Sequence, residues 1–320
     1  MDNGNLVISL DFELLWGVFD KVDHKEKVTY FKNTREVIPQ ILEVFSENGI
    51  SCTWATVGML FNKNWNEWSQ SFPQELPSYD NANLNAYDFG RSIASNENAS
   101  LCFAPELIRK ISNTPGQELA THTYSHYYCS EKGQTPEAFK ADLEMAISKA
   151  REMGIELKSL VFPRNQLNED YLKICHNLGI TSVRSNPSSW YWRDTEDSTF
   201  SKKLFRSGDA YFGKNDKSYP ISRIKKVTGK PLEQPASRLL RPVSGFSFMN
   251  ELKIKRIKSE MIHAAKNKEI YHLWWHPHNF GSDPERSMEE LKEIVSCYRE
   301  CNKKYGFKSL SMKDLSALVN

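Results

Sequence analysis

Two histidines four residues apart, His122 and His126, are the clearest chemical signal in the sequence. They lie in the stretch L-A-T-H-T-Y-S-H at residues 119–126, directly after a short apolar run. A spacing of four is one helical turn, which predicts that both imidazoles share a face and reach one ion. Two neutral imidazoles and one carboxylate make a three-ligand zinc site with a fourth position for water. The pair alone is equally compatible with ordinary core or surface histidines, so the prediction depends on the rest of the chain.

Other reactive side chains end other apolar runs in the same way. They are Asp11 and Glu13 near the start of the chain, Arg164 near its middle, and His276 and His278 near its end. In α/β proteins, functional groups collect at the carboxyl ends of parallel strands. We therefore expect these residues to share one site with the histidine pair.

Together these groups predict a metal-assisted amide or ester hydrolase. Asp11 and Glu13 are two apart on an expected strand and point to one face, so one can bind metal while the other acts as general base. A divalent ion such as zinc lowers the pKa of bound water and polarises a carbonyl oxygen. His276 or His278 is the expected general acid for the departing amine. Arg164 is expected to pair with the base carboxylate and keep it ionised.

Alternation of strands and helices predicts an α/β fold with a parallel sheet and right-handed crossovers. The expected strands are 6–13, 50–57, 118–121, 159–162, 180–184 and 270–275, and the main expected helices are 31–48, 135–153, 168–178, 250–267 and 284–305. Two long stretches, 62–115 and 186–250, break this rhythm and are interpreted as insertions into a single domain, 1–320.

Composition excludes several classes of protein. The chain has 320 residues and a net charge of +2, which gives no strong field for nucleic acid. It contains no run of about 18 apolar residues, so no membrane-spanning helix is expected. The amino terminus lacks the basic and apolar regions of a signal peptide, and the six cysteines are expected to be free thiols in a cytoplasmic protein.

The motifs resemble those of the polysaccharide deacetylases with NodB homology, carbohydrate esterase family 4. The family's motif H-[ST]-x-x-H is matched by H-T-Y-S-H at 122–126. Its first motif, T-F-D-D-G, resembles S-L-D-F-E at 9–13. In this chain one residue separates the two acids of that motif, and the second acid is glutamate instead of aspartate. V-F-P-R-N-Q at 161–166 is similar to the third motif in reordered form, and L-W-W-H at 273–276 to the last.

This resemblance implies a distorted (β/α)7 barrel of the NodB-homology type with long loop insertions. It implies that Asp11 is the general base and that His276 is the general acid, with His278 as the alternative acid. It also implies that Glu13 and the two histidines, His122 and His126, bind a divalent metal, expected to be Zn2+. A backbone N–H at Asn165 or its neighbour is expected to help stabilise the oxyanion.

The resemblance extends to atypical, cytoplasmic members that serve O-antigen or capsule assembly. It implies removal of an acetyl or formyl group from an N-acylated amino sugar, nucleotide- or lipid-linked. Trp190, Tyr191 and Trp192 are expected to stack on the sugar, and Arg238 and Arg241 to meet phosphates. Two alternatives remain: a catalytically inactive carbohydrate-binding homologue, and a hydrolase of a non-sugar C–N bond.

Overall fold

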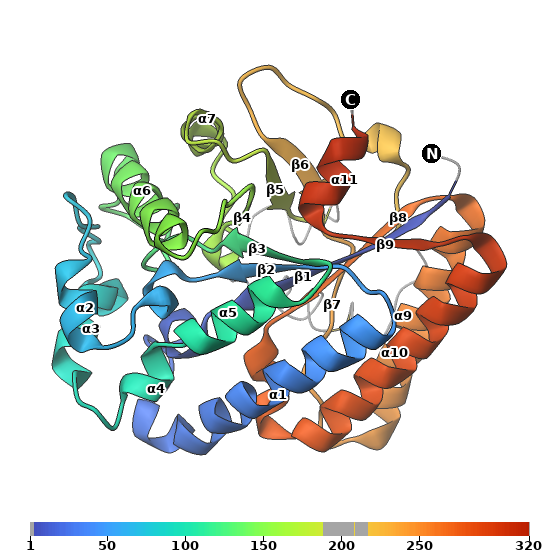
Figure 1. The fold of residues 1–320 in the computed structure, drawn as a ribbon, viewed down its shortest axis with the longest axis horizontal. Coiled ribbons are helices and arrows are strands. Elements are labelled where there is room, and N and C mark those ends of the chain that lie inside the picture. Colours follow the sequence, from blue (N-terminus) through green and yellow to red (C-terminus); the bar gives the residue numbers. More distant parts are fainter. Residues whose placement is uncertain (1–2, 188–207, 209–216, 320) are drawn as a thin grey trace.

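A curved, mainly parallel sheet surrounded by helices forms the body of the computed structural model, which describes residues 3–187, 208 and 217–319 (Figure 1). Its strands are β1 (Asn5–Phe12), β2 (Cys52–Thr56), β3 (Gln117–Thr121), β4 (Ser159–Val161), β5 (Ser182–Ser185), β6 (Leu232–Pro235), β7 (Arg238–Leu239), β8 (Ile270–Trp275) and β9 (Lys308–Leu310). They follow the order β6-β5-β4-β3-β2-β1-β8-β7, and β9 pairs with β1.

One extended segment closes the curved sheet into a barrel. β6 runs parallel to β5, and two residues further along the chain β7 runs parallel to β8. Between them, the N–H of Ala236 donates to Ser185 and that of Ser237 donates to His272. The segment therefore links the two ends of the sheet, which confirms the predicted distorted (β/α)7 barrel.

β1 lies at the centre of the sheet and is buried along its whole length. Its first half pairs with β9, its second half pairs with β2, and β8 lies along its other edge. A strand that has neighbours on both edges and is covered on both faces has a mostly apolar sequence, and β1 fits this pattern. β1 and β8 consequently place their carboxyl ends side by side.

Helices cover the outside of the barrel. They are α1 (Val28–Glu47), α2 (Trp65–Gln70), α3 (Ala86–Ile93), α4 (Ala99–Cys102), α5 (Pro105–Asn113), α6 (Pro136–Glu152), α7 (Leu172–Asn177), α9 (Ser247–Asn267), α10 (Pro284–Tyr305) and α11 (Met312–Leu318). Side-chain caps fix several starts: the Thr135 hydroxyl accepts from Ala138 N–H before α6, and the Asp283 carboxylate from Arg286 N–H before α10. Both caps precede a proline at the first helical position.

The first insertion is more ordered than the sequence indicated. Residues 62–115 form four short helices, α2 to α5, and bring Trp65 and Trp68 against Trp16, which follows β1. The rings of Trp16 and Trp68 stack with centroids 6.0 Å apart. This aromatic packing attaches the insertion to the barrel. In the second insertion, 186–250, residues 188–207 and 209–216 lie outside the described residues, and β6 and β7 fall in its described part.

Among the described residues, no helix has both the length and the apolar character needed to cross a membrane.

Candidate active site

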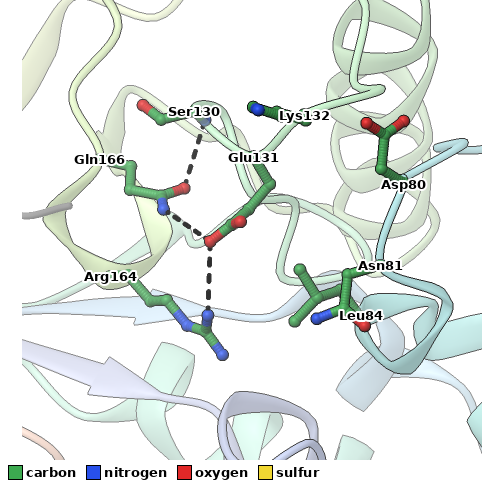
Figure 2. A pocket seen from close by; sticks show the side chains of 8 residues that line it. All are labelled: Asp80, Asn81, Leu84, Ser130, Glu131, Lys132, Arg164 and Gln166. Carbon is green, nitrogen blue, oxygen red and sulfur yellow. Dashed lines mark hydrogen bonds and ion pairs between the residues drawn. The ribbon is translucent and has the colours of Figure 1, made fainter.

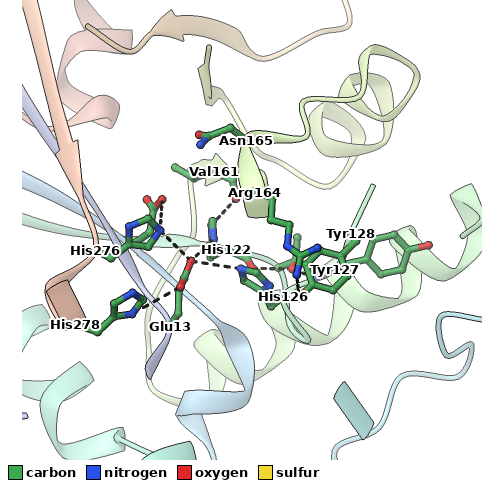
Figure 3. A network of polar contacts seen from close by, with 12 residues as sticks. Glu13, His122, His126, Tyr127, Tyr128, Val161, Arg164, Asn165, His276 and His278 are labelled. Carbon is green, nitrogen blue, oxygen red and sulfur yellow. Dashed lines mark hydrogen bonds and ion pairs between the residues drawn. The ribbon is translucent and has the colours of Figure 1, made fainter. Parts of the chain in front are cut away.

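The Glu13 carboxylate is the point at which the polar side chains converge (Figure 3). Glu13 follows β1 directly, and its Oε1 lies 3.1 Å from His122 Nε2 and 3.3 Å from His126 Nε2. The short helical turn after it contains Gly17, where an added Cβ would approach Glu13 Oε2 to 1.7 Å. Only glycine at position 17 leaves room for this carboxylate.

Both histidines of the pair present their Nε2 atoms to Glu13. His122 Nδ1 lies 2.8 Å from the carbonyl oxygen of Val161 and donates to it, which leaves Nε2 as an acceptor. Burial lowers the pKa of His126 to about 4, despite the opposing effect of Glu13. Burial therefore favours the neutral, metal-binding form of His126, and the Nδ1 contact of His122 turns its Nε2 toward the same point.

The turn that carries the pair is not helical, so the predicted reason for their convergence was wrong. Residues 122–126 contain no helix, and Thr123 and His126 have φ angles of 62° and 59°. The Thr123 hydroxyl accepts from Tyr127 N–H at 2.7 Å, which fixes a tight turn at the end of β3. The histidines reach one point because this turn reverses the chain, not because they share a helical face.

These groups suit a divalent metal. One ligand atom from each of Glu13, His122 and His126 lies within 4.8 Å of the others. Nitrogen ligands at about 2.0 Å from a tetrahedral ion are roughly 3.3 Å apart, close to the separations from Glu13 found here. Two imidazole nitrogens and a carboxylate oxygen form a donor set typical of zinc. Asp11, Glu13 and His276 form a second such group that shares Glu13.

Asp11 pairs with Arg184, an arginine that the sequence analysis did not select. Two nitrogens of the Arg184 guanidinium each donate to one Asp11 oxygen at 2.7 Å, and both side chains are buried. Burial raises the pKa of Asp11, but the charges of Arg184, His122 and His276 and the hydrogen bond from Arg184 together hold that pKa below its ordinary value. The signal was a charged residue at the end of the predicted strand 180–184, a position where an unpaired charge would be costly.

Arg164, the predicted partner of the base, lies elsewhere. Its guanidinium pairs with Asp20 and lies 4.1 Å from the centre of the Tyr128 ring, which itself packs edge-on against His126. Arg164 also borders a cavity of about 490 Å3 beside the site, together with Glu131 (Figure 2). The prediction that Arg164 pairs with Asp11 was therefore wrong: the turn after β4 brings this arginine to Asp20 and Tyr128, and β5 supplies the guanidinium that pairs with Asp11.

The two remaining histidines differ in exposure. His276 Nε2 lies 3.5 Å from Glu13 Oε1 and 3.7 Å from Asp11 Oδ2, and its side chain is 26% exposed. His278 stacks against it but is only 7% exposed, and burial lowers the pKa of His278 to about 3. His276 is thus the better placed of the two to exchange a proton with solvent and substrate.

The predicted substrate-binding residues are dispersed. Asn165 lies at the site, where its Oδ1 accepts from Arg184 at 2.9 Å, but its N–H already donates to Phe162 and does not point to an oxyanion. Arg238 is buried and bound by two hydrogen bonds to Glu260, so it is not placed to meet a phosphate. Arg241 lies half-buried in the loop after β7. Trp190, Tyr191 and Trp192 fall outside the described residues.

Comparison with known proteins agrees with this geometry. The sequence pattern of the polysaccharide deacetylase family matches residues 18–183, more than half of the chain. The chain therefore belongs to the polysaccharide deacetylase family. The matched region includes the histidine pair, whereas Asp11, Glu13, Arg184 and His276 lie outside it.

Solved structures share the fold at low sequence identity. A Mycobacterium smegmatis protein described as a polysaccharide deacetylase is 14% identical, with a TM-score of 0.62 over 99% of this chain and 91% of that one. One from Pseudomonas aeruginosa PAO1 is 11% identical, with a TM-score of 0.58 over 98% and 89%. The Puue allantoinase is 10% identical, with a TM-score of 0.56 over 98% and 88%. None of the curated proteins matches the sequence.

Proposed function

We propose that this protein is a metal-dependent hydrolase that removes an N-acyl group, acetyl or formyl, from an amino sugar. The convergence of His122 and His126 on Glu13, beside the Arg184-paired Asp11, carries the proposal. Membership of the polysaccharide deacetylase family supports a carbohydrate substrate. In this proposal, Glu13, His122 and His126 would bind Zn2+.

A zinc ion bound there would supply Lewis-acid polarisation of the amide carbonyl and ease ionisation of water. The chain's own residues provide the proton transfers. Asp11, kept ionised by Arg184, takes the proton from the attacking water as general base. His276, close to both carboxylates and open to solvent, gives a proton to the nitrogen that leaves as an amine. Asn165 orients Arg184 and thereby the base.

The substrate and setting are part of the same proposal. The sugar is expected to be nucleotide- or lipid-linked and to serve surface-polysaccharide assembly in the cytoplasm. Six buried, unpaired cysteines support a reducing compartment, because buried thiols persist where disulfides do not form. The cavity beside Arg164 offers amide, carboxylate and ammonium groups for the part of the substrate beyond the acyl group.

The experiment has two stages. Metal per chain is measured in purified protein and in the variant His122→Ala, with His263→Ala, a half-exposed histidine of α9, as the matched control. We expect about one zinc-like ion in the wild type and the control and almost none in His122→Ala. Acylated nucleotide sugars are then screened for released acetate or formate.

Each outcome has a defined meaning. Failure to bind zinc, cobalt or nickel would overturn the hydrolase and favour an inactive homologue. Metal binding with sugar binding but no turnover would favour the same alternative. Release of ammonia or a ring-opened product from cyclic amides, with no release from sugars, would favour a hydrolase of non-sugar C–N bonds.

A further inference from the structure

A buried carboxylate on α6 contacts the turn between the two histidines. Asp142 has no exposed surface, and its two oxygens accept hydrogen bonds from Tyr124 N–H at 2.6 Å, from Ser125 N–H at 3.0 Å and from the Ser125 hydroxyl. Tyr124 and Ser125 are central residues of H-T-Y-S-H. No residue of the proposed hydrolytic machinery contacts Asp142 directly.

Burying this charge is costly, which indicates that it has a specific task. Among the described residues Asp142 forms no ion pair, and burial raises the pKa of Asp142 to about 6. An isolated buried carboxylate is unfavourable by several kcal/mol unless hydrogen bonds compensate. All three of its donors come from the turn, so the turn is what this carboxylate stabilises.

The opposite side of the turn is held as well. Gly58 N–H donates to Thr123 O at 2.8 Å, and Met59 N–H donates to Tyr124 O at 2.9 Å. The approach is so close that a Cβ on Gly58 would lie 2.8 Å from Tyr124 Cα. Asp142 therefore binds the N–H groups while residues 58 and 59 bind the carbonyl groups. The turn is clamped from both sides.

Without the clamp, the turn would relax. Thr123 and His126 both adopt left-handed backbone angles, each of which costs about 1 kcal/mol or more in a non-glycine residue. Residues 122–126 could otherwise adopt other backbone conformations, including a helical turn, in which the two imidazoles would point in different directions. The contacts to Asp142 exclude those alternatives because they satisfy the N–H groups in this geometry only.

We propose that Asp142 is a positioning residue that holds the turn between His122 and His126 in the conformation that brings both imidazoles to Glu13. This inference rests on the proposed function for the metal, but the clamped turn itself exists without it. Its effect is on metal affinity and on the order of the turn, and it leaves the chemistry of the bound site unchanged.

Two variants separate this role from general stability. Asp142→Asn keeps the shape but replaces one acceptor oxygen with a donor that faces backbone N–H groups. Glu144→Gln is the matched control, because Glu144 lies on the same helix, is exposed and forms an ion pair with the exposed Lys140 rather than with the turn. Should Asp142→Asn fail to fold, Ser125→Ala removes only the hydroxyl donor and tests the same contact more gently.

The first measurement is zinc affinity by competition with a chromogenic chelator. We expect Asp142→Asn to bind zinc at least about tenfold more weakly than the wild type and Glu144→Gln within about threefold. Saturating zinc should restore kcat to within a few-fold in Asp142→Asn, which loss of a catalytic group would not allow. Unchanged affinity in Asp142→Asn would overturn the inference.

The second measurement needs no metal, so the inference is tested even if the proposed function fails. Amide hydrogen exchange is followed in the metal-free proteins for the peptide that covers 122–128. We expect exchange at least about tenfold faster in Asp142→Asn while β3 and α6 keep their protection. Equal exchange in the wild type and Asp142→Asn would refute a positioning role. Loss of protection throughout α6 would show a merely structural role.

Discussion

Replacement of the two arginines near the site distinguishes the geometry found here from the one predicted from sequence. Arg184 makes two 2.7 Å hydrogen bonds to Asp11 inside the barrel, whereas Arg164 pairs with Asp20 near the surface. The variants Arg184→Gln and Arg164→Gln remove the same charge and leave a side chain of similar polarity. Of these two arginines, Arg184 is the one that contacts Asp11, and we propose that it orients the base.

The magnitudes follow from burial. The Arg184 and Asp11 side chains are 1% and 3% exposed, and removing one partner of such a pair costs about 3–5 kcal/mol. Arg164 is 22% exposed, so its ion pair contributes only about 1 kcal/mol. A positioned general base contributes about 10²- to 10⁴-fold to the rate. We therefore expect kcat to fall at least about 100-fold in Arg184→Gln and less than about tenfold in Arg164→Gln.

The assay is acyl release at saturating metal and substrate, together with thermal unfolding. Asp11→Asn/Arg184→Gln is the control for stability, because removing both charges no longer leaves one of them buried and unpaired. The double variant should melt at a higher temperature than Arg184→Gln and be equally inactive. A larger loss of kcat in Arg164→Gln than in Arg184→Gln would refute the assignment.

Three further expectations concern single groups. Asp11→Asn should abolish turnover and retain metal, measured by metal analysis and acyl release; loss of metal would mean that Asp11 and Glu13 have exchanged roles. His276→Ala should lower kcat more than His278→Ala, because His276 is the more exposed ring, and the reverse ranking would transfer the acid role. Burial raises the pKa of Asp142 from 3.8 to about 6. Protonated Asp142 therefore favours the folded state, and this contribution is complete below about pH 4 and is lost as pH rises through 6. The free energy of unfolding changes by about 3 kcal/mol at most over this range. In denaturant unfolding of the metal-free proteins, the stability of the wild type relative to Asp142→Asn should therefore fall as pH rises through 6. A difference that stays constant with pH would contradict this expectation.

The sequence predicted six of the nine strands described, β1 to β5 and β8, because apolar runs are local signals, and it missed the short strands β6, β7 and β9. Apolar runs that end in reactive side chains identified β1, β3 and β8, and with them Glu13, the histidine pair and His276. Arg184 was missed although it ends a predicted strand, because the local pattern does not show that its partner is Asp11, 173 residues away. The same holds for Asp142, whose helix position is unremarkable until the turn packs against it.

The insertion at 62–115 shows a second limit. Its asparagine, serine and proline content indicated a partly structured insertion with one short helix at 105–112; α5 confirms that helix, and α2, α3 and α4 were not predicted. Asn64 and Asn85 each accept from N–H groups of the helix that follows, so residues that suggested loops in fact start helices. Composition alone does not distinguish these two uses of asparagine.

The position of β1 bears on how the protein is made. β1 pairs with β2, which follows it closely along the chain, but its other partners β8 and β9 begin only at Ile270 and Lys308. At about 5–20 residues per second, β1 waits some tens of seconds during synthesis for these two strands. Its apolar side chains are therefore candidates for chaperone binding during that time. Asp11 and Glu13 acquire their contacts to His276 only after β8 has been made.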